Sequence, residues 1–155
     1  MLIKNQEDFS ALLPSDARLL GLDVGETTIG LALSDHRRSI STPHHTIERK
    51  KFSKDIEQLK AVIENHKVGG LVVGNPLNMD GSEGRRTQSI RTFVSNISKQ
   101  IELPILLWDE RMSTQAVERM MLTADLSRKR RAELVDKLAA SYILQGYLDN
   151  NRFGS

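Results

Sequence analysis

The amino-acid sequence predicts an α/β fold in which one mixed sheet is flanked by helices. Two short apolar runs, over 19–24 and 29–33, are separated by a tight glycine-containing connection, as in a β-hairpin. After residue 53, helical apolar spacing alternates with short β-branched runs, which is the order of parallel strands joined by helices. A hairpin followed by such alternation predicts antiparallel and parallel strands in the same sheet.

The length and composition favour one soluble domain. A chain of 155 residues can bury a core of its own, and 39% hydrophobic with 27% charged residues argues against disorder. No apolar run is long enough to span a membrane, and residues 1–8 lack the pattern of a secretory signal. The absence of cysteine excludes disulfides and thiolate metal sites. We therefore expect a single domain over 1–155, in the cytoplasm and without a membrane partner.

The elements of the first half follow from spacing and turn residues. Residues 5–13 have the spacing of a short amphipathic helix that Pro14 helps to end. The hairpin comes next, and residues 43–47 add an edge strand. A helix then runs over 53–66, with Ser53 as its N-cap. Its apolar stripe consists of Ile56, Leu59, Val62 and Ile63.

The second half continues the alternation. Residues 68–74 form a β-branched run ended by glycine, which indicates a buried parallel strand. A loop over 75–84 and a helix over 85–100 follow. The remaining elements are a strand over 104–108, a helix capped by Ser113, and a long helix capped by Ser127 that reaches about residue 148.

Asp23 is the first candidate functional residue. A carboxylate near the end of an otherwise apolar strand is costly unless it is paired, hydrogen-bonded or bound to a metal. Gly21 and Gly25 on either side allow a ligand or an ion to come close. The alternative is a structural aspartate that accepts hydrogen bonds from the turn over 25–27. Three such carboxylates meeting at one point would hold Mg²⁺ or Mn²⁺.

Asp109 and Glu110 supply a second candidate carboxylate directly after a strand. Because side chains alternate along a strand, only one of the two is expected to share a face with Asp23. Ligands of sheets with helices on both faces collect beyond the carboxyl ends of the strands, where this pair lies. An interaction with Arg111 is the alternative, and the residues alone leave both readings open.

Asp136 is the third candidate carboxylate. It lies four residues before Ala140, on or beside the apolar stripe of the last helix. Small residues in that stripe would let the helix approach the sheet closely. The alternative is a salt bridge with Lys137 or Arg131, and Glu133 is the second choice of carboxylate.

Positively charged residues gather in four groups although the net charge is only +2. A solvated surface explains any single group, but four groups together favour a nucleic-acid partner. The loop over 75–84 could receive a phosphate ahead of the next helix, and an ordinary Asp80-Gly81 turn is the alternative. The groups are Arg37-Arg38, Arg49-Lys50-Lys51, Arg85-Arg86 with Arg91, and Arg128-Lys129-Arg130-Arg131.

With these residues in view, the chain resembles the YqgF family, also called RuvX, of Holliday junction resolvase-like proteins. The resemblance spans roughly residues 18–150, the expected core of the domain. Four ordered motifs make a specific signal, whereas an Asp-x-Gly element alone also occurs in actin-like ATPases and sugar kinases. The motifs are Gly21-x-Asp23-x-Gly25, Val73-Gly74-x-Pro76, Trp108-Asp109-Glu110-Arg111 and Asp136-x-x-Ala139-Ala140.

The resemblance implies a ribonuclease H-like fold with a central five-stranded mixed sheet. It assigns the catalytic, metal-binding carboxylates to Asp23, Glu110 and Asp136, with Asp109 in reserve for the second position. The expected cofactor is Mg²⁺ or Mn²⁺, because both ions suit oxygen-only ligands. The candidate phosphate contacts are Arg85, Arg86, Arg111, Arg128, Lys129, Arg130 and Arg131.

The expected activity is hydrolysis of phosphodiester bonds by a metal-dependent nuclease. Because the family is associated with processing of the small-subunit ribosomal RNA precursor, that RNA, ribosomal particles and branched DNA are the expected partners. A nucleic-acid-binding factor without hydrolysis is the alternative; phosphotransfer from ATP is weaker, because actin-like enzymes need two such domains. The sequence leaves open monomer or homodimer, and the roles of Asp35 and Asp80. Thr27-Thr28 stand where many members have a Lys-Arg pair.

Overall fold

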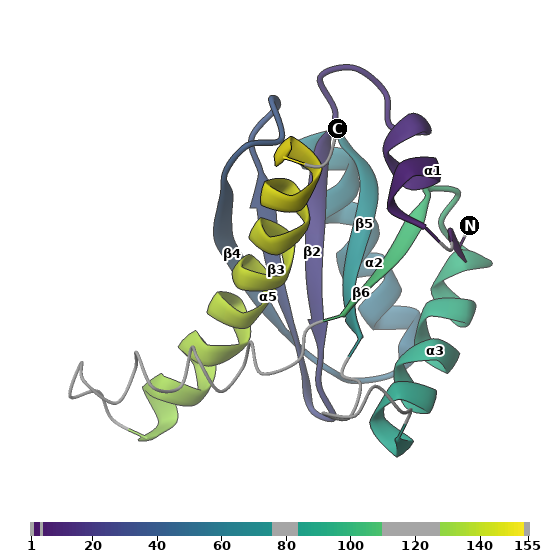
Figure 1. Cartoon of the computed structure of the whole chain (residues 1–155). Coiled ribbons are helices and arrows are strands. Elements are labelled where there is room, and N and C mark those ends of the chain that lie inside the picture. Colours follow the sequence, from purple (N-terminus) through teal and green to yellow (C-terminus); the bar gives the residue numbers. More distant parts are fainter. Residues whose placement is uncertain (1, 4, 76–83, 110–127, 154–155) are drawn as a thin grey trace.

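The computed structural model describes residues 2–3, 5–75, 84–109 and 128–153, and for 85–86, 128–137 and 151–153 it describes the backbone (Figure 1). These residues form one six-stranded sheet with helices on both faces. The prediction of a mixed α/β fold is therefore confirmed. No described helix combines the length and the apolar character needed to cross a membrane.

The sheet has the strand order β1-β6-β5-β2-β3-β4. β2, β3 and β4 are antiparallel neighbours, while β1, β6, β5 and β2 run parallel. The predicted hairpin and edge strand are thus present. The strands are β1 (Leu2–Ile3), β2 (Arg18–Val24), β3 (Thr28–Ser34), β4 (Ser41–Glu48), β5 (Val68–Asn75) and β6 (Ile105–Asp109).

The expected number of five strands is wrong, because β1 adds a sixth. Leu2 and Ile3 pair with Ile105 and Leu106 of β6, and Ile3 packs against the core. Two residues are too few to show the alternation by which a strand is found in a sequence. The tertiary contact with β6, and not local pattern, therefore creates this strand.

Four helices are described. The predicted lead-in helix is shorter than expected, and its N-cap is Asn5, whose Oδ1 accepts a hydrogen bond from the Asp8 amide at 2.8 Å. The expected helix capped by Ser113, and the cap at Ser127, lie outside the described residues. The helices are α1 (Gln6–Ala11), α2 (Phe52–His66), α3 (Arg85–Ser98) and α5 (Arg128–Phe153).

The sequence predicted Ser53 as the N-cap of α2, and this prediction is wrong. The helix begins one residue earlier, Lys51 is at the cap position, and no side chain caps it. The carboxylate of Asp55 instead reaches back and accepts a hydrogen bond from the Lys50 amide at 3.0 Å. An acidic residue in the first turn thus fixes the start of the helix and complements its dipole.

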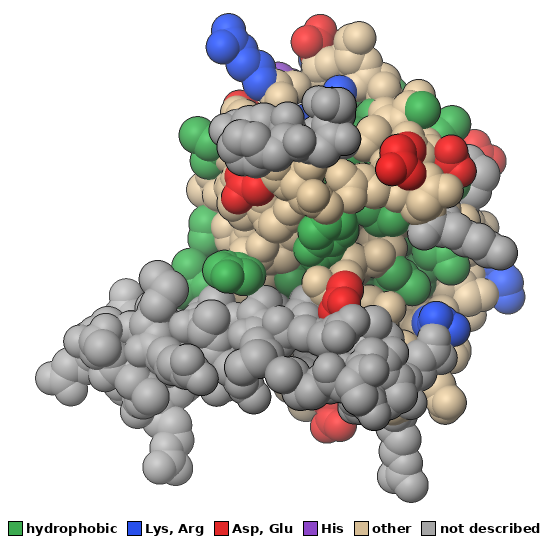
Figure 2. Space-filling model, viewed as in Figure 1, with side chains coloured by type: hydrophobic (Ala, Val, Ile, Leu, Met, Phe, Trp, Pro, Cys, Tyr) green, Lys and Arg blue, Asp and Glu red, His purple; other side chains and the backbone are tan. Residues whose placement is uncertain are grey.

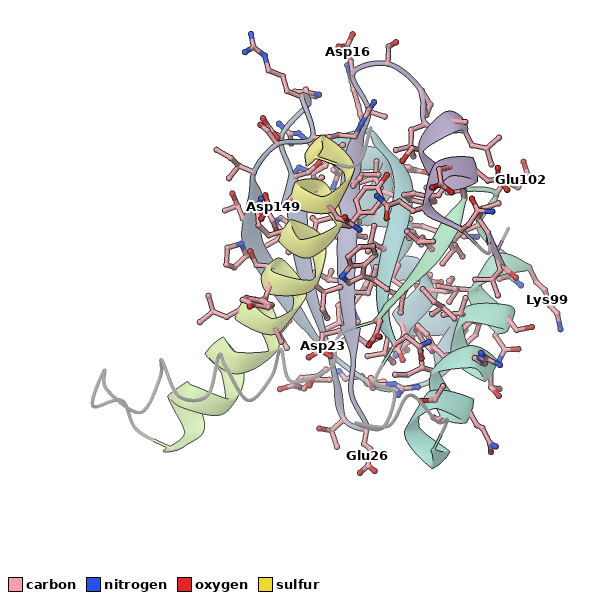
Figure 3. The ribbon with its side chains drawn as sticks, viewed as in Figure 1. Asp16, Asp23, Glu26, Lys99, Glu102 and Asp149 are labelled. Carbon is pink, nitrogen blue, oxygen red and sulfur yellow. The ribbon has the colours of Figure 1, made fainter. Side chains whose placement is uncertain are left out.

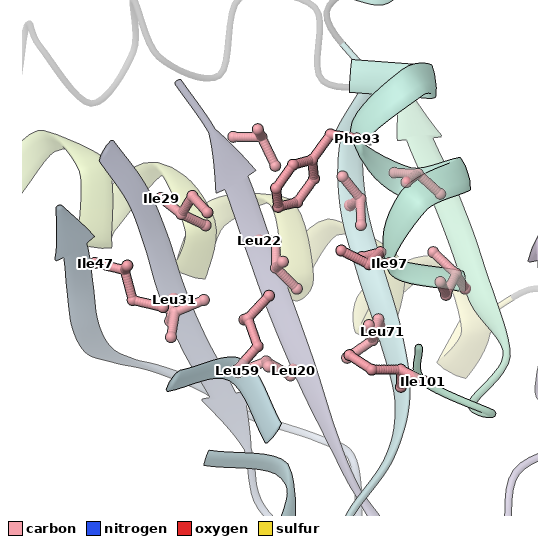
Figure 4. Packing of buried hydrophobic residues seen from close by; sticks show 14 of the residues in the cluster. Leu20, Leu22, Ile29, Leu31, Ile47, Leu59, Leu71, Phe93, Ile97 and Ile101 are labelled. Carbon is pink, nitrogen blue, oxygen red and sulfur yellow. The ribbon is translucent and has the colours of Figure 1, made fainter. Parts of the chain in front are cut away.

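The two faces of the sheet carry two separate apolar clusters. Leu20, Leu22 and Val24 of β2 point to the face covered by α2 and α3 (Figure 4). Leu19 points to the opposite face, where it packs with residues of α1 and α5. Side chains of β2 therefore alternate between the two helical layers, as the pleat of a strand requires.

Gly21 allows α5 to approach the sheet closely. A Cβ atom at this position would lie 2.8 Å from the Leu144 Cβ and 2.9 Å from the Ala140 carbonyl oxygen, closer than real Cβ atoms come. Ala139 and Ala140 are fully buried, in agreement with the prediction that small residues seat this helix on the sheet. The face of β2 that carries Gly21 is hence the α5 face.

Candidate active site

Three parallel strands end together at one edge of the sheet, which we call the carboxyl edge (Figure 1). It is defined by Val24 of β2, Asn75 of β5 and Asp109 of β6, of which the last two are paired in register. β4 also ends here, because it runs antiparallel to β3 and pairs Glu48 with Thr28. Loops after parallel strands form ligand sites at such edges.

Asp23 lies one residue before the end of β2, at the carboxyl edge (Figure 3). Its side chain is only 6% exposed, and its backbone pairs with Gly30 of β3. Because Gly21 faces α5 and side chains alternate, Asp23 also lies on the α5 face. The structure thus holds an almost fully buried carboxylate between the sheet edge and the α5 layer.

The register of α5 on β2 relates Asp136 to Asp23. Leu19 shares a cluster with Tyr147 and Leu148, whereas Gly21 meets Ala140 and Leu144. Two residues along a strand advance about 6.6 Å, and one turn of helix advances about 5.4 Å. Each step of two residues along β2 therefore matches roughly one turn back along α5. One more step brings the backbone turn that contains Asp136 level with Asp23 along the strand direction, while α5 runs obliquely across the sheet (Figure 1).

Asp109 does not share the α5 face with Asp23. Trp108 packs edge-to-face on Tyr147 of α5 at 5.9 Å between ring centroids, and Leu107 packs against the cluster on the opposite face. Alternation puts Asp109 on the side of Leu107. Asp109 is therefore not on the face of Asp23, and the opposite direction expected for Glu110 stays a prediction. Glu110 itself lies outside the described residues.

Asn75 is a polar residue at the carboxyl edge that the sequence reasoning did not single out. Its side-chain oxygen is buried and has no hydrogen-bond partner within the described part of the chain. Asn75 is registered with Asp109, so the two lie side by side on neighbouring strands. A buried amide oxygen at the end of a strand was not distinguishable, in the sequence, from an ordinary loop asparagine.

The candidate phosphate contacts are described only in part. Arg85 and Arg86 begin α3, and Arg128 to Arg131 form the first turn of α5, with backbone placement alone. Arg111 and Asp80 lie outside the described residues. Figure 2 shows hydrophobic side chains along the middle of one face and lysine or arginine side chains at its margins. The described side chains of that face therefore form no continuous basic patch.

Asp35 has a structural role in the loop between β3 and β4. Its carboxylate accepts hydrogen bonds from the Ser39 amide at 2.7 Å, the Ser39 hydroxyl at 2.9 Å and the Ile40 amide at 3.1 Å. Burial alone would raise the pKa of Asp35, but these hydrogen bonds outweigh it and lower the pKa below its ordinary value of 3.8. The loop lies at the end of β3 opposite to the carboxyl edge, so Asp35 is remote from Asp23.

Arg49 was named in the sequence only as a member of a basic group, yet it contacts the turn that follows Asp23. Its Nη1 donates a hydrogen bond to the Gly25 carbonyl at 2.7 Å, and its guanidinium carbon lies 5.1 Å from the centre of the Phe93 ring. The turn itself carries Thr27 and Thr28, and a basic side chain reaches it from the end of β4. No spacing rule connects positions 25 and 49, so sequence reasoning missed this contact.

Of the three predicted metal ligands, only Asp23 has a described side chain, so the fit of a metal ion can be examined at this residue alone. Among the described residues, no group of three or more His, Asp or Glu side chains could hold a metal ion. The predicted set also needs the side chains of Glu110 and Asp136, which are not described. The donor that is described fits a hard divalent cation, since Asp23 presents carboxylate oxygens from a buried, backbone-fixed position.

Comparison with known families places these motifs in context. A family model described as "RuvX: Holliday junction resolvase" matches residues 17–150. A protein from Paramagnetospirillum magneticum named "Putative pre-16S rRNA nuclease" is 60% identical over 140 residues, which cover 90% of each chain. A protein of the same name from Rhodobacter capsulatus is 55% identical over 96% of this chain and 94% of its own length.

Comparison with solved structures supports the fold. RuvC of Thermus thermophilus superimposes with a TM-score of 0.50 at 14% identity, over 88% of this chain and 96% of RuvC. The structure of T. thermophilus RuvC with a Holliday junction substrate gives the same TM-score and identity over 89% of this chain. The ribonuclease H-like fold expected from the sequence is therefore confirmed.

Proposed function

Because the chain belongs to the RuvX family, we propose that it is a metal-dependent nuclease that hydrolyses phosphodiester bonds in structured nucleic acid. The observation that carries the proposal is Asp23, a carboxylate 6% exposed at the carboxyl edge, on the face that α5 covers. A buried charge at such an edge is typical of a site that binds a cation or a reacting group.

The proposed catalytic carboxylates are Asp23, Glu110 and Asp136. The register between β2 and α5 supports Asp136, because the helical turn that carries it is level with Asp23. Because Asp109 lies on the opposite face, alternation along the strand would put Glu110 on the face of Asp23. Three carboxylates of this kind would hold Mg²⁺ or Mn²⁺.

In the proposed mechanism, one set of residues binds the metal ion and another set binds the nucleic acid. Asp23, Glu110 and Asp136 would hold the divalent ion, whose chemistry would be to activate the attacking water and to stabilise the leaving oxygen. Asp23 would orient the site, since its backbone pairs with Gly30 of β3. The start of α3 is suited to a phosphate, because its N-cap is Gly84, which has no side chain to cap the first amides. The proposed phosphate contacts are Arg85, Arg86, Arg111, Arg128, Lys129, Arg130 and Arg131.

The proposed substrate is the precursor of small-subunit ribosomal RNA. Support comes from relatives at 60% and 55% identity, both named for a pre-16S rRNA nuclease. The family description instead names a Holliday junction resolvase, so a four-way DNA junction is the alternative substrate. Processing of ribosomal RNA would place the protein in the cytoplasm, beside ribosomal particles. The proposed function is compatible with a monomer and with a homodimer.

The test is cleavage of two labelled substrates, pre-16S rRNA and a synthetic four-way DNA junction, in Mg²⁺, Mn²⁺ or chelator. The variants are Asp23→Asn, which keeps the size of the side chain, and Asp109→Asn, a matched control at the same edge but on the opposite face. We expect cleavage that needs metal and is lost in Asp23→Asn but kept in Asp109→Asn. Full activity of Asp23→Asn would refute the assignment. Binding without cleavage by the wild type would favour the binding-factor alternative.

A further inference from the structure

Arg49 lies where the end of β4 meets the turn between β2 and β3. β4 is antiparallel to β3 and pairs Glu48 with Thr28, so the residue after Glu48 lies beside the turn. The Arg49 amide donates a hydrogen bond to the Thr27 carbonyl at 2.8 Å, which continues the pairing beyond the end of the strand. The backbone of Arg49 is therefore fixed on the turn that follows Asp23.

The guanidinium group of Arg49 is held on two sides. Nη1 donates to the Gly25 carbonyl at 2.7 Å, a short distance typical of a charge-assisted hydrogen bond. The guanidinium carbon lies over the ring of Phe93, 5.1 Å from the ring centre, which is a cation–π contact. Phe93 is 5% exposed and packs edge-to-face on Phe52 at 6.0 Å, so the ring is itself immobilised by the core.

The turn that Arg49 holds is tightly wound. The Gly25 amide donates to the Thr28 carbonyl at 2.8 Å, and a Cβ at Gly25 would lie 3.1 Å from that same oxygen. Asp23 is only two residues before Gly25, and its carboxylate points to the α5 face while Arg49 and Phe93 lie toward α3. The contact with Arg49 thus fixes the turn from the side opposite to the carboxylate.

We propose that Arg49 is a positioning residue for Asp23: by joining the Gly25 carbonyl to the Phe93 ring, it fixes the β2–β3 turn and with it the carboxylate at the carboxyl edge. This inference rests on the proposed nuclease function. A catalytic group displaced by about 1 Å can lose roughly 100-fold in rate. Because the Gly25 carbonyl that Arg49 binds is only two residues from Asp23, loosening of the turn would reach the carboxylate through a short stretch of backbone.

Three variants test the proposal. Arg49→Gln removes the charge and its contact with the Phe93 ring, Arg49→Lys keeps the charge without the planar fork, and Lys50→Gln removes a neighbouring exposed charge as the matched control. We expect Arg49→Gln and Arg49→Lys to lower kcat by about 10- to 100-fold with little change in KM for the nucleic acid. Lys50→Gln should keep the wild-type kcat.

Phe93→Leu provides a second route to the same contact, because it keeps an apolar core residue but removes the ring face. It should lower kcat in the same direction, and the double variant Arg49→Gln/Phe93→Leu should be no slower than Arg49→Gln, since both changes remove one shared contact. Thermal melts of each variant identify any that fails to fold.

Amide hydrogen exchange separates failure of this inference from failure of the nuclease proposal. In Arg49→Gln, exchange of the Gly25 amide should accelerate while amides in the middle of β2 stay protected, and Lys50→Gln should match the wild type. If the wild type cleaves nothing, the nuclease proposal fails and exchange alone decides whether Arg49 holds the turn. Unchanged exchange in Arg49→Gln overturns the inference, and so does a raised KM with unchanged kcat, which would make Arg49 a phosphate contact.

Discussion

Replacement of Gly21 by alanine should move α5 and thereby weaken the candidate active site. The added Cβ would lie 2.8 Å from the Leu144 Cβ and 2.9 Å from the Ala140 carbonyl oxygen. Neither atom can move by a change of rotamer, because one is the first side-chain carbon and the other belongs to the backbone. The clash can be relieved only by shifting α5 or β2 as a body.

The expected loss of stability follows from overpacking. Forcing an extra carbon into a closely packed site costs about 1–3 kcal/mol. For a chain near this size, each kcal/mol lowers Tm by roughly 2–4 °C. Because the turn of α5 that carries Asp136 is one turn from Ala140, the same shift should also lower the cleavage rate of the folded protein.

The control for Gly21→Ala is Gly69→Ala. A Cβ at Gly69 would lie 2.5 Å from the Ala17 Cβ and 3.0 Å from the Pro14 Cδ, far from the carboxyl edge. Both variants should lower Tm, but only Gly21→Ala should lower the initial rate of cleavage per folded molecule, measured below the melting range. Equal rates in the two variants, or an unchanged Tm for Gly21→Ala, would refute the reasoning.

Two further predictions concern groups away from the carboxyl edge. The lowered pKa of Asp35 means that its hydrogen bonds stabilise the fold above the ordinary value of 3.8, and that this contribution is lost as pH falls through the folded pKa. Urea unfolding should therefore show Asp35→Asn less stable than the wild type at pH 7, with a difference that shrinks in acid; a difference independent of pH would contradict this. Tyr147→Phe removes a 2.5 Å hydrogen bond to the Ser10 hydroxyl, and should cost about 0.5–1.5 kcal/mol in a thermal or urea melt. Burial raises the pKa of Tyr147 above 10.0, so the wild type should also lose stability as pH rises past that value, whereas the phenylalanine variant should not lose this component.

Most of the fold could be predicted because the sequence pattern within each strand or helix is enough to identify it. The apolar runs of β2 and β3, and the stripe of α2, follow directly from residue spacing. What could not be predicted depends on contacts between distant residues. β1 exists only because β6 pairs with it, and the start of α2 is set by Asp55 binding a backbone amide and not by the expected serine.

The candidate site likewise contains residues that could be predicted from local sequence and one that could not. Asp23 could be singled out because a carboxylate in an apolar strand is conspicuous, and the structure places it at the carboxyl edge. Alternation along the strand predicts that Asp109 and Glu110 point in different directions, and of these two residues the structure describes only Asp109. Arg49 could not be found, because its role depends on a hydrogen bond to Gly25, which is 24 residues away in the sequence.

The mixed pairing of the sheet explains why charged groups distant in sequence gather at the carboxyl edge. β2 ends there, β3 leads away, and β4 returns, so Arg49 arrives beside the turn that follows Asp23. Arg38, in contrast, lies in the loop at the other end of the sheet, where its Nη1 donates to the Pro14 and Ala17 carbonyls at 3.0 and 2.9 Å. The Arg37-Arg38 group thus stabilises the end of the sheet that lies opposite to the carboxyl edge. Nucleic-acid binding should accordingly be sought at the basic group that begins α3, which the strand directions bring to the same edge as Asp23.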